Sequence, residues 1–202
     1  EQCVSCQPQA PSVTLPKGGG AIRGMGEKFA TNPATGAGSM SVPIVTSGGR
    51  SGVRPELALS YSSGAGNGPF GFGWGLPLAT ITRKTDKGLP QYHDSTDSDV
   101  FIMSGAEDLV PEFQQDDQGE WLLVDGKPVI HEMPRTVGGT AYLVRRYRPR
   151  IEGGFIRIER WTNLDHAGDV HWRALSRENI LTVFGKDAHS RIADPLEPAR
   201  IY

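Results

Sequence analysis

The chain alternates apolar with small residues in two neighbouring runs, Met40-Ser41-Val42-Pro43-Ile44 and Leu57-Ala58-Leu59-Ser60-Tyr61. Side chains two positions apart lie on one face of a β-strand, so each run predicts a half-buried strand. Between them, Ser47-Gly48-Gly49-Arg50-Ser51-Gly52 supplies glycines that can adopt the positive φ angles of a chain reversal. The two runs therefore predict an antiparallel hairpin.

Strand-like segments continue downstream at intervals of roughly ten to fifteen residues, with turn signals between them. The run Val100-Phe101-Ile102-Met103 is fully apolar, which is typical of a strand buried on both faces. The remaining predicted strands are residues 78–82, 121–124, 141–147, 155–161, 170–175 and 180–184. This spacing predicts an all-β fold, mainly of antiparallel sheet, arranged as an open sheet, a sandwich or a barrel.

Glycine and proline are abundant, with 26 Gly and 15 Pro among 202 residues. Both interrupt helices and both serve in turns, so their number agrees with short strands joined by Gly-rich loops. Residues 17–38 are rich in glycine and predict an irregular but ordered loop. With 37% hydrophobic and 22% charged residues, the chain is long enough for one sizeable β domain or two small ones.

The charges are balanced and interleaved: 21 basic and 23 acidic residues leave a net charge of -2. This distribution argues against nucleic acid and against an anionic membrane surface as partners. No apolar stretch approaches the roughly 20 residues of a membrane-spanning helix, so we expect no membrane span.

The first residues predict a flexible leader, because residues 1–16 are rich in Gln, Pro and Ser and carry little apolar content. The chain opens on Glu1, and no signal peptide can be read after it, so we interpret the sequence as a fragment or a processed product. Cys3 and Cys6 are open to three interpretations: a local disulfide, half a metal site or two ordinary thiols. No second ligand pair exists to complete a zinc site.

A glycine-aromatic segment, Gly64-Ala65-Gly66-Asn67-Gly68-Pro69-Phe70-Gly71-Phe72-Gly73-Trp74-Gly75, contains the dinucleotide pattern G-x-G-x-x-G at residues 66–71. A dinucleotide site needs a helix directly after that loop, and the Gly- and Pro-rich residues that follow cannot begin one. The segment instead predicts a structural corner, in which the backbone approaches closely and large rings fill pockets.

An acidic loop with Asp94, Asp97 and Asp99 has the composition of a calcium site but lacks the spacing and the glycine of an EF-hand. An exposed acidic turn before a buried strand explains it equally well. The five histidines never share an element at ligand spacing. We therefore predict neither a metal nor a cofactor.

Candidate catalytic groups are carboxylates without a distinguishing feature, and no G-x-S-x-G nucleophile motif occurs. Carboxylate pairs for glycoside hydrolysis could be formed by Glu107-Asp108, Asp116-Asp117 and Glu159, whose default role is solvation or pairing with arginines. A basic cluster, Arg145, Arg146, Arg148 and Arg150, is interpreted as a solvated strand edge that resists aggregation. No catalytic residue is assigned.

Five longer motifs resemble the amino-terminal domain shared by SpvB and the TcaC-like B component of insecticidal toxin complexes. They occur in the same order as in that family, and the resemblance extends from about Val13 to Tyr202. The motifs are residues 15–29, residues 64–74 with 81–90, residues 99–110, residues 157–161 and residues 190–195.

The resemblance implies a domain at residues 17–202, truncated at its carboxy end, that helps to build a larger β shell of the Rhs/YD cocoon type. In that family the shell of B and C components encloses a toxic polypeptide before its release through the A component. The expected partners are the remainder of the B-type polypeptide and a C-type component, with the A-type component reached only through regions absent here. We expect a secreted, extracellular protein made in the bacterial cytoplasm. No segment here matches the ADP-ribosyltransferase part of SpvB, so we expect no enzymatic activity.

Two other functions remain open at this point. A carbohydrate-binding or carbohydrate-cleaving domain would require Trp74, Trp121, Trp161 and Trp172 to be exposed along one groove. An independent secreted, adhesin-like module would require residues 17–202 to fold alone as a monomer.

Overall fold

The computed structural model describes residues 28–31, 36–94, 98–104, 107–166, 168–197 and 200–202. The chain divides into two compact units, Glu1–Pro77 and Leu78–Tyr202. This division falls within residues 17–202, and the assignment of that range to one domain stays a prediction. The predicted leader at 1–16, with Cys3 and Cys6, lies outside the described residues.

The all-β prediction is confirmed, because the described residues contain no α-helix and their strand pairs are antiparallel. Within the same residues, no helix is long and apolar enough to cross a membrane.

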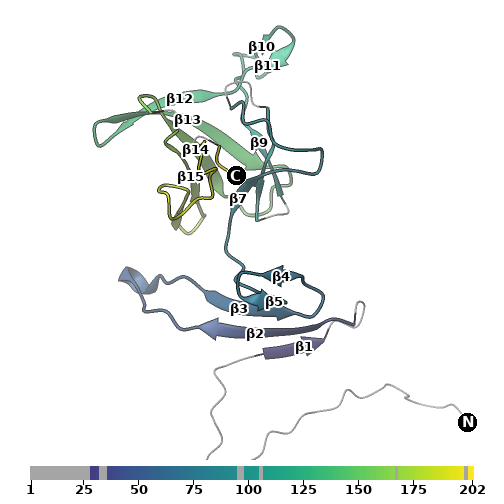
Figure 1. Ribbon diagram of the computed structural model, residues 1–202. Coiled ribbons are helices and arrows are strands. Elements are labelled where there is room, and N and C mark those ends of the chain that lie inside the picture. The colour runs from purple at the N-terminus through teal and green to yellow at the C-terminus, as the bar shows by residue number, and fades with distance from the viewer. Residues whose placement is uncertain (1–27, 32–35, 95–97, 105–106, 167, 198–199) are drawn as a thin grey trace, which may run out of the picture. The chain divides into compact units, whose positions relative to one another are not determined.

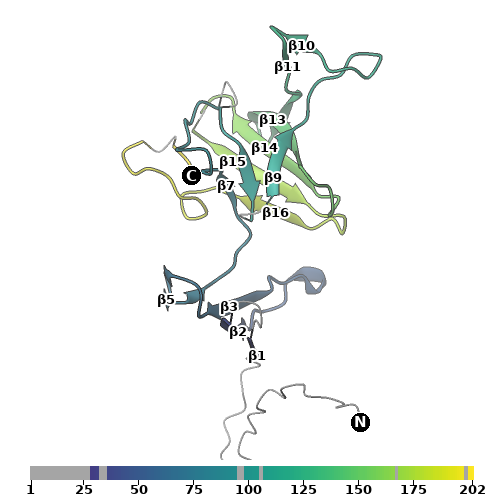
Figure 2. The ribbon, with the colours of Figure 1, turned by 90° about the vertical axis from the view of Figure 1, so that its right-hand side faces the viewer.

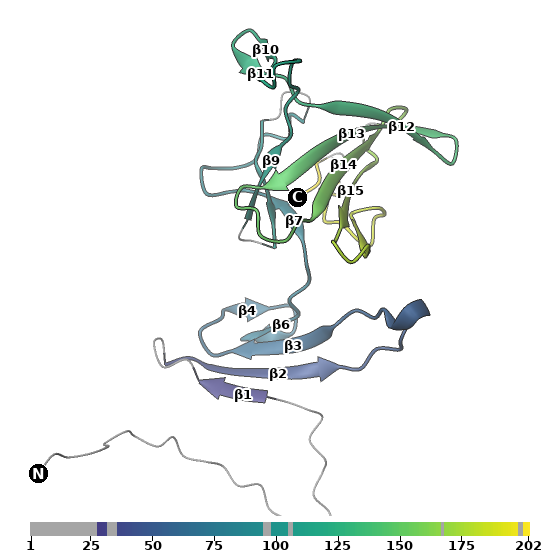
Figure 3. The same cartoon turned by 180° about the vertical axis from the view of Figure 1, so that it is seen from behind.

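The first unit contains a four-stranded sheet in the order β1-β2-β3-β6 (Figure 3). The predicted hairpin is confirmed as β2 and β3, in which Met40 faces Tyr61 and Val42 faces Leu59. A 3-10 turn, η1 (Arg50–Gly52), lies in the connection. Strand β1 forms within residues 17–38, where the sequence predicts a loop. The strands are β1 (Lys28–Thr31), β2 (Gly38–Ile44), β3 (Leu57–Ser62) and β6 (Trp74–Gly75).

The glycine-aromatic corner folds as two very short strands, β4 (Asn67–Gly68) and β5 (Gly71–Phe72), followed by Gly73. Gly73 has a φ of +80°, and a Cβ there would lie 2.5 Å from Cε2 of Tyr61. The close backbone approach is therefore confirmed. The rings behave differently from the prediction, since Phe70 and Phe72 are exposed because no second layer of described residues covers them.

The second unit contains an eight-stranded sheet in the order β16-β15-β14-β13-β9-β8-β7, with β12 paired to β13 (Figures 1 and 2). A separate two-stranded hairpin is made by β10 and β11. The strands are β7 (Ile81–Arg83), β8 (Phe101–Met103), β9 (Glu107–Pro111), β10 (Leu123–Val124), β11 (Lys127–Pro128), β12 (Glu132–Val137), β13 (Thr140–Pro149), β14 (Arg157–Asn163), β15 (Val170–Leu175) and β16 (Leu181–Phe184).

Both faces of the central strands β13–β15 carry a hydrophobic cluster. Ile158 and Trp161 of β14 belong to different clusters, and residues three apart on a strand point to opposite faces. The larger cluster contains Phe101, Leu109, Tyr147, Ile158, Trp172 and Ala174, and the smaller contains Tyr142, Val144 and Trp161. The sheet therefore positions side chains on two buried surfaces.

Two sequence predictions are wrong in this unit. Strand β8 is not buried on both faces, because only Phe101 is fully buried, while Ile102 and Met103 are half-buried and Val100 is 48% exposed. The arginine cluster is not a sheet edge either. Three of its four arginines lie on β13, which pairs with β12, β14 and β9, whereas Arg150 follows that strand and its side chain is 72% exposed.

Candidate functional site

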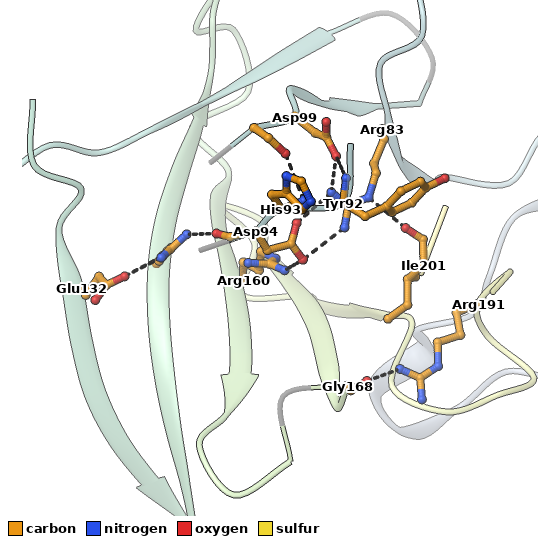
Figure 4. Close-up of polar contacts among 12 residues, drawn as sticks. Arg83, Tyr92, His93, Asp94, Asp99, Glu132, Arg160, Gly168, Arg191 and Ile201 are labelled. Atoms are coloured by element: carbon orange, nitrogen blue, oxygen red, sulfur yellow. Dashed lines mark hydrogen bonds and ion pairs between the residues drawn. The ribbon is translucent and has the colours of Figure 1, made fainter. Parts of the chain in front are cut away.

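Arg83, at the end of β7, makes four side-chain hydrogen bonds to described residues of the second unit. Its side chain is only 4% exposed. Nη1 donates to Asp94 at 2.7 Å and to Asp99 at 2.8 Å, and Nη2 donates to Asp94 at 3.1 Å (Figure 4). Nε donates to the backbone carbonyl of Ile201 at 2.9 Å. One buried guanidinium thus joins β7, the loop after it and the last residues of the chain.

The loop between β7 and β8 is organised around Asp99. Its carboxylate accepts hydrogen bonds from the backbone amides of Gln91 and Tyr92, each at 2.8 Å. Tyr92 has a φ of 60°, a left-handed conformation that is unfavourable for a tyrosine. The contacts to Asp99 therefore help to hold a strained loop in place.

A second buried arginine reaches the loop from the centre of the sheet. Arg160 of β14 is 4% exposed and donates through Nη2 to Asp94. Arg145 of β13 donates to the backbone carbonyl of Asp94 at 3.0 Å and pairs with Glu132 of β12 (Figure 4). Asp94 is therefore bound by three arginines from three strands.

The four central groups form an electrically balanced cluster of two arginines and two aspartates, which we call the ion cluster: Arg83, Asp94, Asp99 and Arg160. Burial alone would raise the pKa of Asp94, but the hydrogen bonds and charges of Arg83 and Arg160 outweigh it and hold this pKa below 3.8. For Asp99, burial is likewise outweighed by the Gln91 and Tyr92 amides and by Arg83, so its pKa is also lowered. Both carboxyls are ionised at neutral pH.

Aromatic rings enclose the ion cluster. The guanidinium carbon of Arg83 lies 4.7 Å from the ring centre of Tyr92 and 4.9 Å from that of Phe101. Tyr92 in turn meets Tyr202 edge-to-face, with ring centres 5.9 Å apart. Through these contacts Tyr202, at the end of the described residues, packs against the loop that contains Asp94 and Asp99.

A pocket of about 620 Å³ opens beside the ion cluster. Its lining comes from β7 and β16 at the two ends of the sheet order, from β8, β14 and β15 between them, and from the segments before β7 and after β16. The lining includes Arg83 and Arg160 but is mainly apolar, with Ile81, Phe101, Trp172 and Phe184. It has the size and composition to bury an apolar side-chain cluster or a small ligand.

A fully buried histidine lies on the other face of the sheet. His171 is 0% exposed, and its ring stacks on Trp161 with ring centres 6.0 Å apart. Nε2 accepts a hydrogen bond from Nε of Arg173 at 3.2 Å. Burial, with the charges of Lys186 and Arg173, lowers the pKa of His171 to about 4, so the ring is neutral at pH 7.

The residues that the sequence named as candidate sites bind protein groups. Asp94 and Asp99, considered for calcium, both bind Arg83, and Asp97 lies outside the described residues. Among the residues that the structure describes, no three metal-ligating side chains cluster. Glu159 accepts from Trp161 at 3.0 Å and pairs with Arg157 at 3.1 Å.

Three of the other carboxylate candidates are likewise engaged within the protein, and Asp117 is exposed. Asp108 pairs with Lys84 at 2.8 Å, Glu107 accepts the amide of Ile151, and Asp116 closes its own turn through the amide of Gln118.

The four tryptophans do not line one groove. Trp161 and Trp172 are buried, in the smaller and the larger cluster respectively. Trp121 is 53% exposed on the segment that carries the β10–β11 hairpin, and Trp74 packs on Tyr61 in the first unit. The carbohydrate alternative rested on their joint exposure and is unsupported.

Comparison with known proteins identifies the family. The SpvB family, described as Salmonella virulence plasmid 65kDa B protein, matches residues 32–202. The chain belongs to the SpvB family. SpvB proteins named mono(ADP-ribosyl)transferase, from Salmonella typhimurium and Salmonella dublin, are each 37% identical to it over 181 residues, which is 90% of this chain. The resemblance predicted from sequence is confirmed.

Solved structures extend this relationship to toxin complexes. The crystal structure of TcdB2-TccC3 matches 96% of this SpvB-family chain and 8% of its own chain, with 32% identity and a TM-score of 0.66. The N-terminal domain of the effector SpvB from Salmonella typhimurium strain LT2 matches 75% of this chain and 44% of its own, with 34% identity and a TM-score of 0.58. The homology therefore relates this chain to TcdB2-TccC3 as well as to the SpvB proteins.

The names of the curated relatives contradict one expectation. The sequence predicted a protein without enzymatic activity, whereas these relatives are named as mono(ADP-ribosyl)transferases. The SpvB-family chain spans 28% of their length. The prediction failed because it took the absence of a matching transferase segment in 202 residues as a property of the protein.

The ion cluster itself was missed by the sequence interpretation, although a signal for it existed. Arg83 stands two residues after Ile81 and directly after the predicted strand 78–82, so if that strand continues by one residue both side chains point to the same face. A charge on a core face requires a buried partner, and the acidic loop follows within 16 residues. That combination predicts an internal ion pair better than it predicts calcium.

Proposed function

We propose that this chain is a structural component of a bacterial toxin complex, forming part of the hollow shell that encapsulates a toxic polypeptide and helps to deliver it. The observation that carries the proposal is the match to TcdB2-TccC3 over 96% of this chain at 32% identity. At that identity, with a TM-score of 0.66, the two share a fold throughout the matched region.

The ion pairs and hydrogen bonds between buried arginines and the acidic loop support a structural role. Arg83, Arg160 and Arg145 all bind the acidic loop, so the strongest polar interactions tie β7, β13 and β14 to one loop. Buried arginine pairs of this kind define a single arrangement of neighbouring strands, because any other register would leave a buried charge unpaired. A protein shell that keeps a constant shape needs strands that pair in one fixed register.

The open ends of the large sheet also favour a part of a larger assembly. Strands β7 and β16 each have one paired neighbour within the described sheet. Leu181 and Val183 of β16 are exposed, and an exposed apolar edge strand normally gains a neighbour or a cover. The partners we propose are the remainder of the same B-type polypeptide and a C-type component. An A-type component would be contacted only through other regions of the polypeptide.

The proposed domain comprises residues 17–202, and the proposed location is extracellular after synthesis in the bacterial cytoplasm. The test is to co-express the full-length gene product with the C-type component of its operon, and to examine the product by size exclusion and electron microscopy. We expect a closed hollow particle in which the toxic polypeptide resists added protease. Separate elution of the two proteins, or digestion of the cargo at the rate of the free C-type component, would overturn the proposal.

A further inference from the structure

The four-stranded sheet of the first unit has one continuous apolar face. Met40 of β2 faces Tyr61 of β3, and Tyr61 faces Trp74 of β6, so their side chains form a row on one side of the sheet. Two further cross-strand pairs on the same side, Val42 with Leu59 and Ile44 with Leu57, extend this row. The apolar face consists of Met40, Val42, Ile44, Leu57, Leu59, Tyr61 and Trp74.

The opposite side of the same strands has a different composition. Ser39 pairs with Ser62 and Ser41 pairs with Ser60, and the only other pair between β2 and β3 on this side is Pro43 with Ala58. No large apolar side chain from β2 or β3 stands there. The sheet is therefore two-sided, with a small polar side suited to solvent and an apolar side suited to a packed interior.

No described part of the first unit buries the apolar face completely. Six of its seven side chains are half-buried, none is fully buried, and Ile44 is 38% exposed. The buried hydrophobic residues of the chain's described part all lie in the second unit, from Phe101 to Ala174. A sheet with one apolar face needs a second layer against that face to be stable in water.

We infer that the apolar face packs against a β-sheet contributed by the same polypeptide outside residues 1–202. This inference rests on the proposed function, in which the chain is one part of a shell-forming protein. The face carries no charged residue, so its partner is apolar and neither nucleic acid nor an anionic surface. A flat, pleated apolar surface is complemented by another sheet, stacked about 10 Å away.

The relatives supply the reason to place that sheet in the same polypeptide. The region that matches this chain is 8% of the TcdB2-TccC3 chain and 28% of the curated SpvB proteins. Most of each relative therefore lies outside the matched region, and a covering layer from the same chain costs no association entropy. A separate partner would have to cover the face only after both had folded.

Photocrosslinking in the full-length gene product tests the inference with a matched pair of positions. A benzophenone amino acid replaces Leu59, on the apolar face, or Ser60, its neighbour on the opposite side of β3. After irradiation, crosslinked peptides are identified by mass spectrometry. We expect position 59 to link to peptides beyond residue 202, and position 60 to give no such link.

Every other pattern overturns the inference. Links from position 59 to residues 1–27, to residues 78–202 or to the C-type component would identify a different cover. Links between isotopically light and heavy copies would identify a second copy. The same downstream links from positions 59 and 60 would refute the assignment of the face.

A second measurement avoids any substitution. Met40 on the apolar face should be oxidised by dilute peroxide about tenfold more slowly in the folded full-length product than after unfolding in denaturant. Equal rates would mean that the face is uncovered.

The experiments distinguish failure of this inference from failure of the proposed function. A product that forms no hollow particle, yet links position 59 to downstream peptides, would contradict the proposed function and support this inference. A hollow particle without those links would do the reverse.

Discussion

Nε of Arg83 donates a 2.9 Å hydrogen bond to the carbonyl oxygen of Ile201, which is 118 residues further along the chain. The same guanidinium binds Asp94 and Asp99. A single side chain therefore holds the first strand of the second unit, the loop after it and the last described residues together. Its removal should weaken all three connections at once.

Replacing Arg83 by methionine should destabilise the second unit by about 3–5 kcal/mol, because Asp94 keeps Arg160 whereas the buried Asp99 loses its charged partner. The free energy of unfolding from urea titration measures the effect. Arg177→Gln is the control, since the Arg177 side chain is 73% exposed and the loss of its solvent-screened pair with Glu178 should change the free energy of unfolding little. A loss below about 1 kcal/mol for Arg83→Met would show that the cluster is not a structural element.

Acid should destabilise the second unit as the carboxylates of the ion cluster take up protons. The folded-state pKa values of Asp94 and Asp99 lie below the ordinary value of 3.8. The unfolded chain therefore binds protons first, and stability is lost as the pH falls below about 4. Urea midpoints measured from pH 6 to pH 2.5 test this. Asp94→Asn should be less stable at pH 6 and lose less on acidification, whereas parallel curves for both proteins would contradict the prediction.

His171 predicts a second pH dependence in a higher range. Its folded-state pKa of about 4 lies below the ordinary 6.5, so the unfolded chain binds the proton first and stability falls as the pH drops from 6.5 towards 4. Linkage gives a loss of about 2 kcal/mol by pH 5. His171→Phe should remove this loss between pH 7 and pH 5. Lys186→Met should reduce it, because Lys186 lowers the pKa of His171. An unchanged pH dependence in His171→Phe would rule the group out.

Gly73→Ala should destabilise the first unit by about 2 kcal/mol or more, because the residue has a φ of +80° and its new Cβ would meet the Tyr61 ring and the Ser62 carbonyl. Hydrogen exchange of the β3 amides reports on this unit separately. Gly66→Ala is the matched control, since a Cβ at Gly66 would meet no atom within 4 Å and the φ of this residue is not positive. Equal exchange in the two variants would refute the requirement for glycine at position 73.

The local sequence pattern predicted the positions of most strands, but it did not predict correctly which side chains are buried. The prediction for residues 170–175 coincides with β15, and that for 180–184 is within one residue of β16. Both have clear alternation and flanking turns. Strand β12 was missed because Glu132–Val137 contains proline and charged residues, and its pairing with β13 supplies what its own propensity lacks. The position of β13 inside the sheet likewise depends on strand order, which local pattern does not contain.

The amino-acid sequence by itself determined that this chain is an antiparallel β protein of the SpvB family, with a glycine corner at Gly73 and a hairpin at β2 and β3. Those features depend on residues close together in the chain. Only the tertiary structure decided that Asp94 binds Arg83 and Arg160, and that no side chain on the apolar face of the first unit is fully buried. Both depend on residues far apart in sequence, whose proximity is set by strand order and packing.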